Sequence, residues 1–452
     1  MKYLFILCSF LGSLSAWAQG IMKTGNRQVV FKDVNVVAMD SDSIHANKTV
    51  VVQNGKVISV SAASNAVYPK GAVIVEGKGR YLMPGLAEMH AHVPPVDNLE
   101  PMKETLLLFA VNGVTTIRGM LGHPRHLELR AKIRSGEIPG PHFYTSGPSF
   151  NGNTVQNEQQ AATRVKEQEA AGYDFLKLHP GLKLQNFDAV VSAAQKAGIP
   201  FAGHVSYDVG IWRAIEAGYA TVDHMDGFVE ALVPGIESIP EQQRGLFATF
   251  IGHRADSNAI PKLVSALKEN TIWVVPTQAL AERWLAPVDP VQLAAQPEMV
   301  YVNKKTLDDW ISTKQSLLGN PAYKKEQVEQ FLRIRRKLIY EVNKAGLLLL
   351  GSDGPQVFNV PGFSVHHELQ YLVDAGLTPY EAIKTGTVNV GRFYKNPLMG
   401  TIREGAPADL VLLSANPLTD IKNTKSIEGV LIGSTWFSKQ AINEILQKLN
   451  KK

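Results

Sequence analysis

Short apolar segments alternate with amphipathic helical stretches through most of this chain, and this alternation limits the folds open to it. Strands that alternate with helices are typical of a parallel sheet, and eight such strands are typical of a closed barrel. We therefore expect an α/β fold in which residues 85–399 form a (β/α)8 TIM barrel. The eight expected strands lie within residues 82–93, 113–120, 142–150, 174–180, 199–206, 221–227, 271–278 and 347–355.

Both ends of the chain have a different pattern, of short alternating strands without intervening helices. Residues 19–84 contain a hairpin signal at Asn54-Gly55, and strand patterns return in residues 400–452. We expect the two ends to build one small β-sandwich, with a tail at the C-terminus. Residues 284–340 are predicted to be a helical insertion, and the sequence leaves open whether it covers the barrel mouth or decorates its flank.

The first 18 residues have the features of a signal peptide. Lys2 precedes an apolar run from Tyr3 to Leu14, and Ala16-Trp17-Ala18 fits a cleavage site before Gln19. The run is too short to span a bilayer, which needs about 20 residues. We expect an exported protein, periplasmic or secreted. The only cysteine, Cys8, lies in this segment, so the mature chain would have neither a thiol ligand nor a disulfide.

The charge pattern argues against nucleic acid as a partner. The chain has 46 basic and 41 acidic residues, and the basic residues are spread along it apart from a mild cluster in residues 331–340 and lysines in the tail. No segment of the mature chain has the length and apolar character of a membrane span. We expect a small-molecule or short-peptide substrate, and a homo-oligomer is left open.

Polar residues stand at the C-terminal ends of five expected strands, where the catalytic groups of a TIM barrel lie. Alternate residues of a strand face the same side, so His90 and His92 could bind one metal ion together. His204 and His224 follow successive strands and could bind a second ion, with zinc as the first choice. The candidate metal ligands are His90, His92, Lys177, His204, His224 and Asp353.

Lys177 is unusual in this set because a cation repels divalent metal ions. Either the amine is carboxylated by carbon dioxide to an anionic carbamate, or it points away and pairs with an acid. Its place between Leu176 and Leu178 favours the carbamate. Other polar residues just beyond the expected strand ends are candidates for substrate binding, whereas His366 and His367 enter a helix and are interpreted as structural. The substrate candidates are Arg118, His123, His179, Tyr207 and Gln356.

In these segments the chain resembles the amidohydrolase superfamily of metal-dependent hydrolases, closest to its imidazolonepropionase-like and Xaa-Pro dipeptidase branch. The resemblance implies two metal ions, one held by His90, His92 and Asp353 and the other by His204 and His224, with carboxylated Lys177 bridging both. Departures occur at Asp223-His224, where relatives often have Glu-His, and at Arg118-Gly119, where many have Arg-Asp. The matching segments are PGLAEMHAH, GVTTIRGM, YDFLKLHPG, FAGHVS, TVDHMDG, GSDGP, AGLTPYEAIKTGTVNVGRFY and GTIREGAPADLVLLSANPL.

The expected reaction is cleavage of an amide C–N bond, in a dipeptide such as Xaa-Pro or in another acylated amine. A metal-bridged hydroxide would attack the carbonyl, and Asp353 would carry the proton to the leaving nitrogen as general acid-base catalyst. Two alternatives stay open: hydrolysis or deamination of a cyclic amide or heterocycle, and a non-catalytic binding module on a degenerate barrel. A serine hydrolase is disfavoured because the mature chain has no G-x-S-x-G motif.

Overall fold

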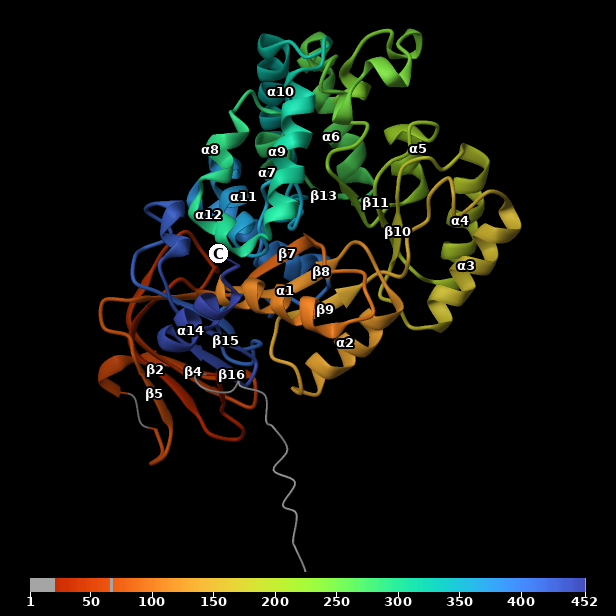
Figure 1. Ribbon diagram of the computed structural model, residues 1–452. Coiled ribbons are helices and arrows are strands. Elements are labelled where there is room, and N and C mark those ends of the chain that lie inside the picture. Colours follow the sequence, from red (N-terminus) through yellow and green to blue (C-terminus); the bar gives the residue numbers. More distant parts are fainter. Residues whose placement is uncertain (1–20, 66–67, 452) are drawn as a thin grey trace, which may run out of the picture.

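The computed structural model describes residues 21–65 and 68–451 (Figure 1). The expected signal peptide, its cleavage site before Gln19 and Cys8 lie outside these residues. Within the described part of the chain, none of the helices has both the length and the apolar character needed to cross a bilayer.

Parallel strands build the central part of the molecule in two hydrogen-bonded sheets. In the larger sheet Leu176 pairs with Phe201, and isolated bridges from Ser146 to Phe175 and from Phe150 to Leu178 connect the two sheets. The side chains of these parallel strands are almost all buried, as expected for strands covered by helices. One sheet contains β7 (Leu86–Ala91), β8 (Val114–Gly119) and β9 (His142–Thr145), and the other contains β10 (Leu176–Leu178), β11 (Phe201–Gly203), β12 (Thr221–Asp223) and β13 (Trp273–Val275).

Residues 347–355, expected as the eighth strand, form no strand in the described chain. Leu349 N donates to Val274 O at 2.9 Å, and Met89 N donates to Leu350 O at 2.9 Å. A further isolated bridge joins Ala91 to Gly354. This segment therefore lies between β13 and β7 and bonds to both, but with too few consecutive bonds for a ladder.

Helices follow most of these strands and lie outside them (Figure 1). Local sequence explains their ends: the Asn157 side chain caps the first turn of α3, and Gly198 ends α4 with a left-handed φ of 71°. The helices between the strands are α1 (Leu99–Val111), α2 (Pro124–Arg134), α3 (Glu158–Ala170), α4 (Leu184–Ala197), α5 (Gly210–Ala217) and α6 (Ile260–Glu269), and after residue 350 follow α11 (Phe363–Asp374), α12 (Pro379–Thr385) and α13 (Val388–Phe393).

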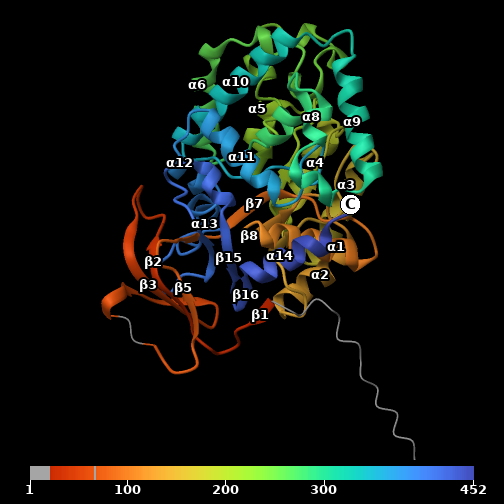
Figure 2. The ribbon, with the colours of Figure 1, turned by 60° about the vertical axis from the view of Figure 1, so that its left-hand side comes forward.

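The two ends of the chain share one nine-stranded sheet, as Figure 2 shows for the red and blue strands. β14 pairs with β6, which joins the C-terminal strands to the N-terminal ones. Asn54 and Gly55 turn the expected hairpin with φ of 51° and 71°. The described residues of the two chain ends form this one sheet, and its closure into a β-sandwich stays a prediction. The strands are β1 (Ile21–Lys23), β2 (Val29–Val36), β3 (His45–Gln53), β4 (Lys56–Ala62), β5 (Val73–Glu76), β6 (Tyr81–Pro84), β14 (Asp409–Leu413), β15 (Ile427–Ile432) and β16 (Thr435–Ser438), and α14 (Lys439–Leu449) follows.

The insertion at residues 284–340 is helical, as expected. It contains α8 (Pro290–Ala294), α9 (Lys304–Leu318) and the start of α10 (Lys325–Lys344). α10 packs against α6 and against the short helical turn Gly252–Arg254. From the whole insertion only Trp284 lines the large cavity described below. The insertion is therefore mainly a flank of the molecule and not a cover of its mouth.

Candidate metal centre and its cavity

The C-terminal ends of the parallel strands bring the six predicted ligands together. Asp353 is central: its Oδ1 lies 2.8 Å from His92 Nε2 and 3.8 Å from His90 Nε2, and its Oδ2 lies 3.7 Å from His224 Nδ1. The His224 ring also stacks on His204 with 4.3 Å between centroids. His90, His224 and Asp353 each offer a ligand atom within 4.8 Å of the others, a spacing that could hold one metal ion.

Several buried polar atoms at this centre have no hydrogen-bond partner. They include Lys177 Nζ, His224 Nε2 and Asp353 Oδ1. Asp353 Oδ1 is close to His92 Nε2, but the two atoms do not meet in hydrogen-bond geometry. A buried polar atom without a partner costs about 1–3 kcal/mol, so a cluster of such atoms is typical of a site that binds a ligand. Imidazole and carboxylate donors suit zinc and similar ions, and the residues present therefore fit a metal centre.

Two of the histidines are hydrogen-bonded at Nδ1 to a neighbouring side chain, and a third has a carboxylate beside its Nδ1 without hydrogen-bond geometry. His90 Nδ1 lies 2.9 Å from Asp223 Oδ2, and His204 Nδ1 lies 2.7 Å from Asp226 Oδ2. His224 Nδ1 lies 2.9 Å from the Thr277 hydroxyl. Such partners fix the orientation of a ligating imidazole and leave its other nitrogen for the metal.

Burial keeps three histidines of this centre, His90, His204 and His224, in the neutral form. Desolvation holds the pKa of His90 and His224 well below the ordinary value, and it lowers the pKa of His204 to about 3. Burial likewise lowers the pKa of Lys177 to about 8, against the attraction of Asp223. Neutral imidazoles are the form that binds metal, so the electrostatics agree with the geometry.

Three buried carboxylates of the site, Glu88, Asp223 and Asp226, were not among the predicted site residues. Asp223 lies between His90 and the Arg118 guanidinium, 3.3 Å from Arg118 Nη2, and Lys177 Nζ is 3.9 Å away. Glu88 accepts from the backbone N–H of His90 at 2.8 Å, and desolvation raises its pKa to about 8. A signal existed for Glu88, because Glu88, His90 and His92 alternate and so face one side of their strand.

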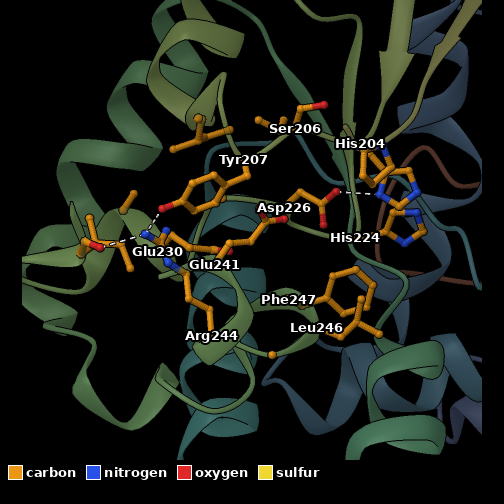
Figure 3. Close-up of a pocket in the computed structure, with 18 of the residues that line it drawn as sticks. His204, Ser206, Tyr207, His224, Asp226, Glu230, Glu241, Arg244, Leu246 and Phe247 are labelled. Atoms are coloured by element: carbon orange, nitrogen blue, oxygen red, sulfur yellow. Dashed lines mark hydrogen bonds and ion pairs between the residues drawn. The ribbon is translucent and has the colours of Figure 1, made fainter. Parts of the chain in front are cut away.

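A cavity of about 1270 Å³ opens from the metal centre. His90, His92, His204, His224 and Asp353 line its inner end. Figure 3 shows Tyr207 and Arg244 on the far side from His204 and His224. Arg244 donates to the Tyr207 hydroxyl and to the Ile236 and Ile239 carbonyls, so it fastens this wall. Most of the wall comes from residues 205–247, where the sequence had indicated only Tyr207 and the segment around His224. The apolar members of this wall include Ile211, Trp212, Val233, Pro234, Leu246 and Phe247.

The predicted substrate residues divide into two groups. His179, Tyr207 and Gln356 line the cavity. Arg118 does not: it is 2% exposed, and it donates to Met89 O at 2.8 Å and to the Thr221 hydroxyl at 2.9 Å. Its assignment as a substrate residue is corrected, because β8 continues through Gly119 and keeps Arg118 inside the strand.

His123 is corrected for a similar reason. It is the N-cap of α2, its Nδ1 accepts from Arg125 N, and it does not line the cavity. His366 and His367 are bonded away from the centre, His366 to the Thr424 hydroxyl and His367 to Glu298, in agreement with a structural role.

Comparison with known proteins places this geometry in context. The model of the amidohydrolase family matches residues 81–437. Among curated proteins, an ochratoxinase from Aspergillus niger is 45% identical over 103 residues. That match covers 21% of this chain and only 20% of the ochratoxinase.

Solved structures share the fold over almost the whole chain. A bottromycin amidohydrolase superposes with a TM-score of 0.69 at 22% identity and covers 94% of this chain and 90% of its own. A Xaa-Pro dipeptidase with methionine bound in its active site gives 0.64 at 17% identity, with 91% and 100% covered. The Aspergillus niger ochratoxinase structure gives 0.63 at 20% identity, with 92% and 96% covered.

Proposed function

The chain belongs to the amidohydrolase family, and from this premise we propose that it cleaves the amide bond of a short peptide, Xaa-Pro dipeptides being the first substrates to test. The family and the assignment as a hydrolase of carbon–nitrogen bonds confirm two predictions made from the sequence. One observation carries the proposal: four histidines, Lys177 and Asp353 meet at the inner end of a cavity of about 1270 Å³.

The proposal includes two divalent ions, with zinc first. His90, His92 and Asp353 would hold one ion, and His204 and His224 the other. When bound, such ions polarise a carbonyl and lower the pKa of a bound water molecule to about 7. The neutral histidines and the buried atoms without partners support this assignment.

We propose that Lys177 carries a carboxyl group and contributes to both metal sites. Its Nζ is fully buried and has no hydrogen-bond partner. The neutral amine nitrogen would form a bond to carbon dioxide and release one proton, which gives an anionic carbamate. That change turns a cation among the ligands into an oxygen donor, the type of ligand that divalent ions prefer.

Asp353 would hold the proton during the reaction. It is 3% exposed and faces both His92 and the cavity, so its carboxylate can take a proton from the attacking water and pass it to the leaving nitrogen. Asp226 and Thr277 hold His204 and His224 at Nδ1, and the Asp223 carboxylate lies 2.9 Å from His90 Nδ1. The apolar wall and Tyr207 would bind the side chains of the peptide and keep bulk water away.

A hydrolysis screen tests the substrate. Purified, zinc-loaded protein is incubated with a dipeptide library that includes Xaa-Pro and the reversed Pro-Xaa sequences, with Asp353→Asn protein as control. We expect release of free amino acids by the wild type alone. Ammonia release from a heterocycle without any dipeptide cleavage would instead favour deamination, and metal binding without turnover of either class would favour a binding module.

We also propose export and a closed architecture. The mature chain would begin near Gln19, and residues 347–350 would complete an eight-membered barrel ring, with the shared sheet of the chain ends folded into a sandwich. The bonds of Leu349 and Leu350 to the two neighbouring strands support the ring. Intact-mass measurement of protein from an exporting host tests the first point, and a mature mass that retains residues 1–18 would contradict export.

A further inference from the structure

Arg335 is a buried cation in the helical insertion at residues 284–340. It lies on α10 and its side chain is 0% exposed. A buried arginine lowers the stability of the fold unless its N–H groups find acceptors. Its hydrogen-bond acceptors therefore indicate the role of the residue. No carboxylate among residues 21–65 and 68–451 forms an ion pair with it.

Its partners lie instead at the ends of two neighbouring strands. Arg335 Nη1 donates to the backbone carbonyl of His224 at 2.8 Å, and Nη2 donates to that of Pro276 at 2.8 Å. Nε donates to Gln278 Oε1 at 2.9 Å. The planar guanidinium thus ties the segment after β12 to the segment after β13 with geometry that a single ammonium group could not reproduce.

Both of these segments have an unfavourable backbone. His224 has a φ of 61° and Thr277 a φ of 46°, in the left-handed region that non-glycine residues seldom adopt. Such conformations cost on the order of 1–3 kcal/mol each and persist where the surroundings hold them. Thr277, whose β-branched side chain is poorly suited to this region, is also the residue whose hydroxyl contacts His224 Nδ1 at 2.9 Å.

We infer that Arg335 is a positioning residue for the metal centre: it holds the His224 and Pro276–Thr277 segments together so that Thr277 orients the His224 ring toward the metal. The aromatic rings of Phe247 and Phe331, each 5.7 Å from Arg335 Cζ, keep the guanidinium in place. This inference rests on the metal site of the proposed function. On this inference α10 supports the metal centre through Arg335, although the insertion contributes only Trp284 to the cavity wall.

Cobalt binding by the full-length mature protein tests the inference without relying on activity. Arg335→Met, Arg335→Lys and Thr277→Val are compared with the wild type and with Arg333→Met, which removes an exposed arginine from the same helix. We expect Arg335→Met and Thr277→Val to bind Co²⁺ about 10- to 100-fold more weakly and with an altered visible spectrum, because partners of a ligand typically tune affinity by that factor. Arg335→Lys should recover part of the loss, and Arg333→Met should match the wild type.

Circular dichroism and thermal unfolding of the metal-free proteins show which variants fold. Wild-type Co²⁺ affinity and spectrum in folded Arg335→Met would overturn the inference. If that variant does not fold, the same result in Arg335→Lys or in Thr277→Val would overturn it. Failure of the wild type itself to bind Co²⁺ would overturn the proposed metal site, which separates the two claims.

Discussion

The rim of the parallel strands and the sheet shared by the chain ends bury different chemistry. At the rim, Lys177 and Asp353 are buried with atoms that have no hydrogen-bond partner. In the shared sheet, the core is an apolar cluster in which Phe31 meets Trp436 edge to face at 5.5 Å. The second arrangement stabilises a fold, whereas the first costs stability and is useful only when a ligand satisfies it. Substitutions in the two regions should therefore change different measured quantities.

The largest expected effect comes from Asp353→Asn at the rim. The amide cannot carry the proton, so the turnover number should fall by about 10²- to 10⁴-fold, the usual contribution of a general acid-base group. The fold should be retained, because the carboxylate makes no hydrogen bond at Oδ1 that the fold requires. Rate, metal content and circular dichroism are measured together. Near-normal turnover of a folded, metal-loaded variant would refute the role of Asp353.

Metal content gives the next test. Wild-type protein should hold about two ions per chain after mild loading, and Lys177→Ala should hold about one or fewer, because an oxygen donor shared by both sites is lost. Elemental analysis decides this, and chelation followed by zinc should remove and then restore turnover. If Lys177→Ala leaves both metal content and activity unchanged, the two-metal site with a carbamate is wrong.

Phe31→Ala tests the sheet shared by the chain ends. Phe31 is 0% exposed on β2 and packs against Trp436 on β16, so truncation should lower the free energy of unfolding by about 3–5 kcal/mol. Turnover per folded molecule should stay the same. Denaturant unfolding and active-site-normalised rates are the measurements, with exposed Ile58→Ala as the control in the same sheet. A change in turnover number in folded Phe31→Ala would show that the two regions are coupled.

The smallest effect should come from the contact between the two regions. His142 Nε2 on β9 lies 3.0 Å from Asp409 Oδ1 on β14, and that carboxylate raises the pKa of His142 above its ordinary value. A raised folded pKa means that the stabilisation is fully present below the unfolded pKa of about 6.5 and is lost as pH rises through the folded pKa. The side chain is 49% exposed, so we expect less than about 1 kcal/mol.

Unfolding of wild type and His142→Gln is compared at pH 5.5 and pH 8.5. The difference between the two proteins should be larger at the lower pH. An equal difference at both values, or a larger one at pH 8.5, would contradict the assigned direction.

Much of the candidate site could be predicted because neighbouring parallel strands place their last residues at one edge of the sheet. Periodicity and strand ends were enough to select His90, His204 and Asp353. They could not select Asp223 or Arg335, since the role of each depends on contacts between segments far apart in the chain, such as that of Arg335 with His224.

The exact end of a strand could not be predicted from the sequence either. Arg118 was expected beyond a strand end, but β8 runs through Gly119, and a difference of one or two residues moves a side chain from the rim to the interior. Apart from Tyr207 and His224, the cavity wall of residues 205–247 was not predicted, because much of it consists of short helical turns without a regular apolar period, such as Leu246–Ala248.

The sheet built from both chain ends also has a consequence for biosynthesis. β1 pairs with β16, and β6 pairs with β14, so β1 and β6 acquire these partners only after residues 409–438 have been synthesised. Until then the edge of β6 is open to pairing with other chains. A nonsense mutation shortly before Asp409 would therefore leave all six candidate metal ligands encoded and yet yield a protein prone to aggregation.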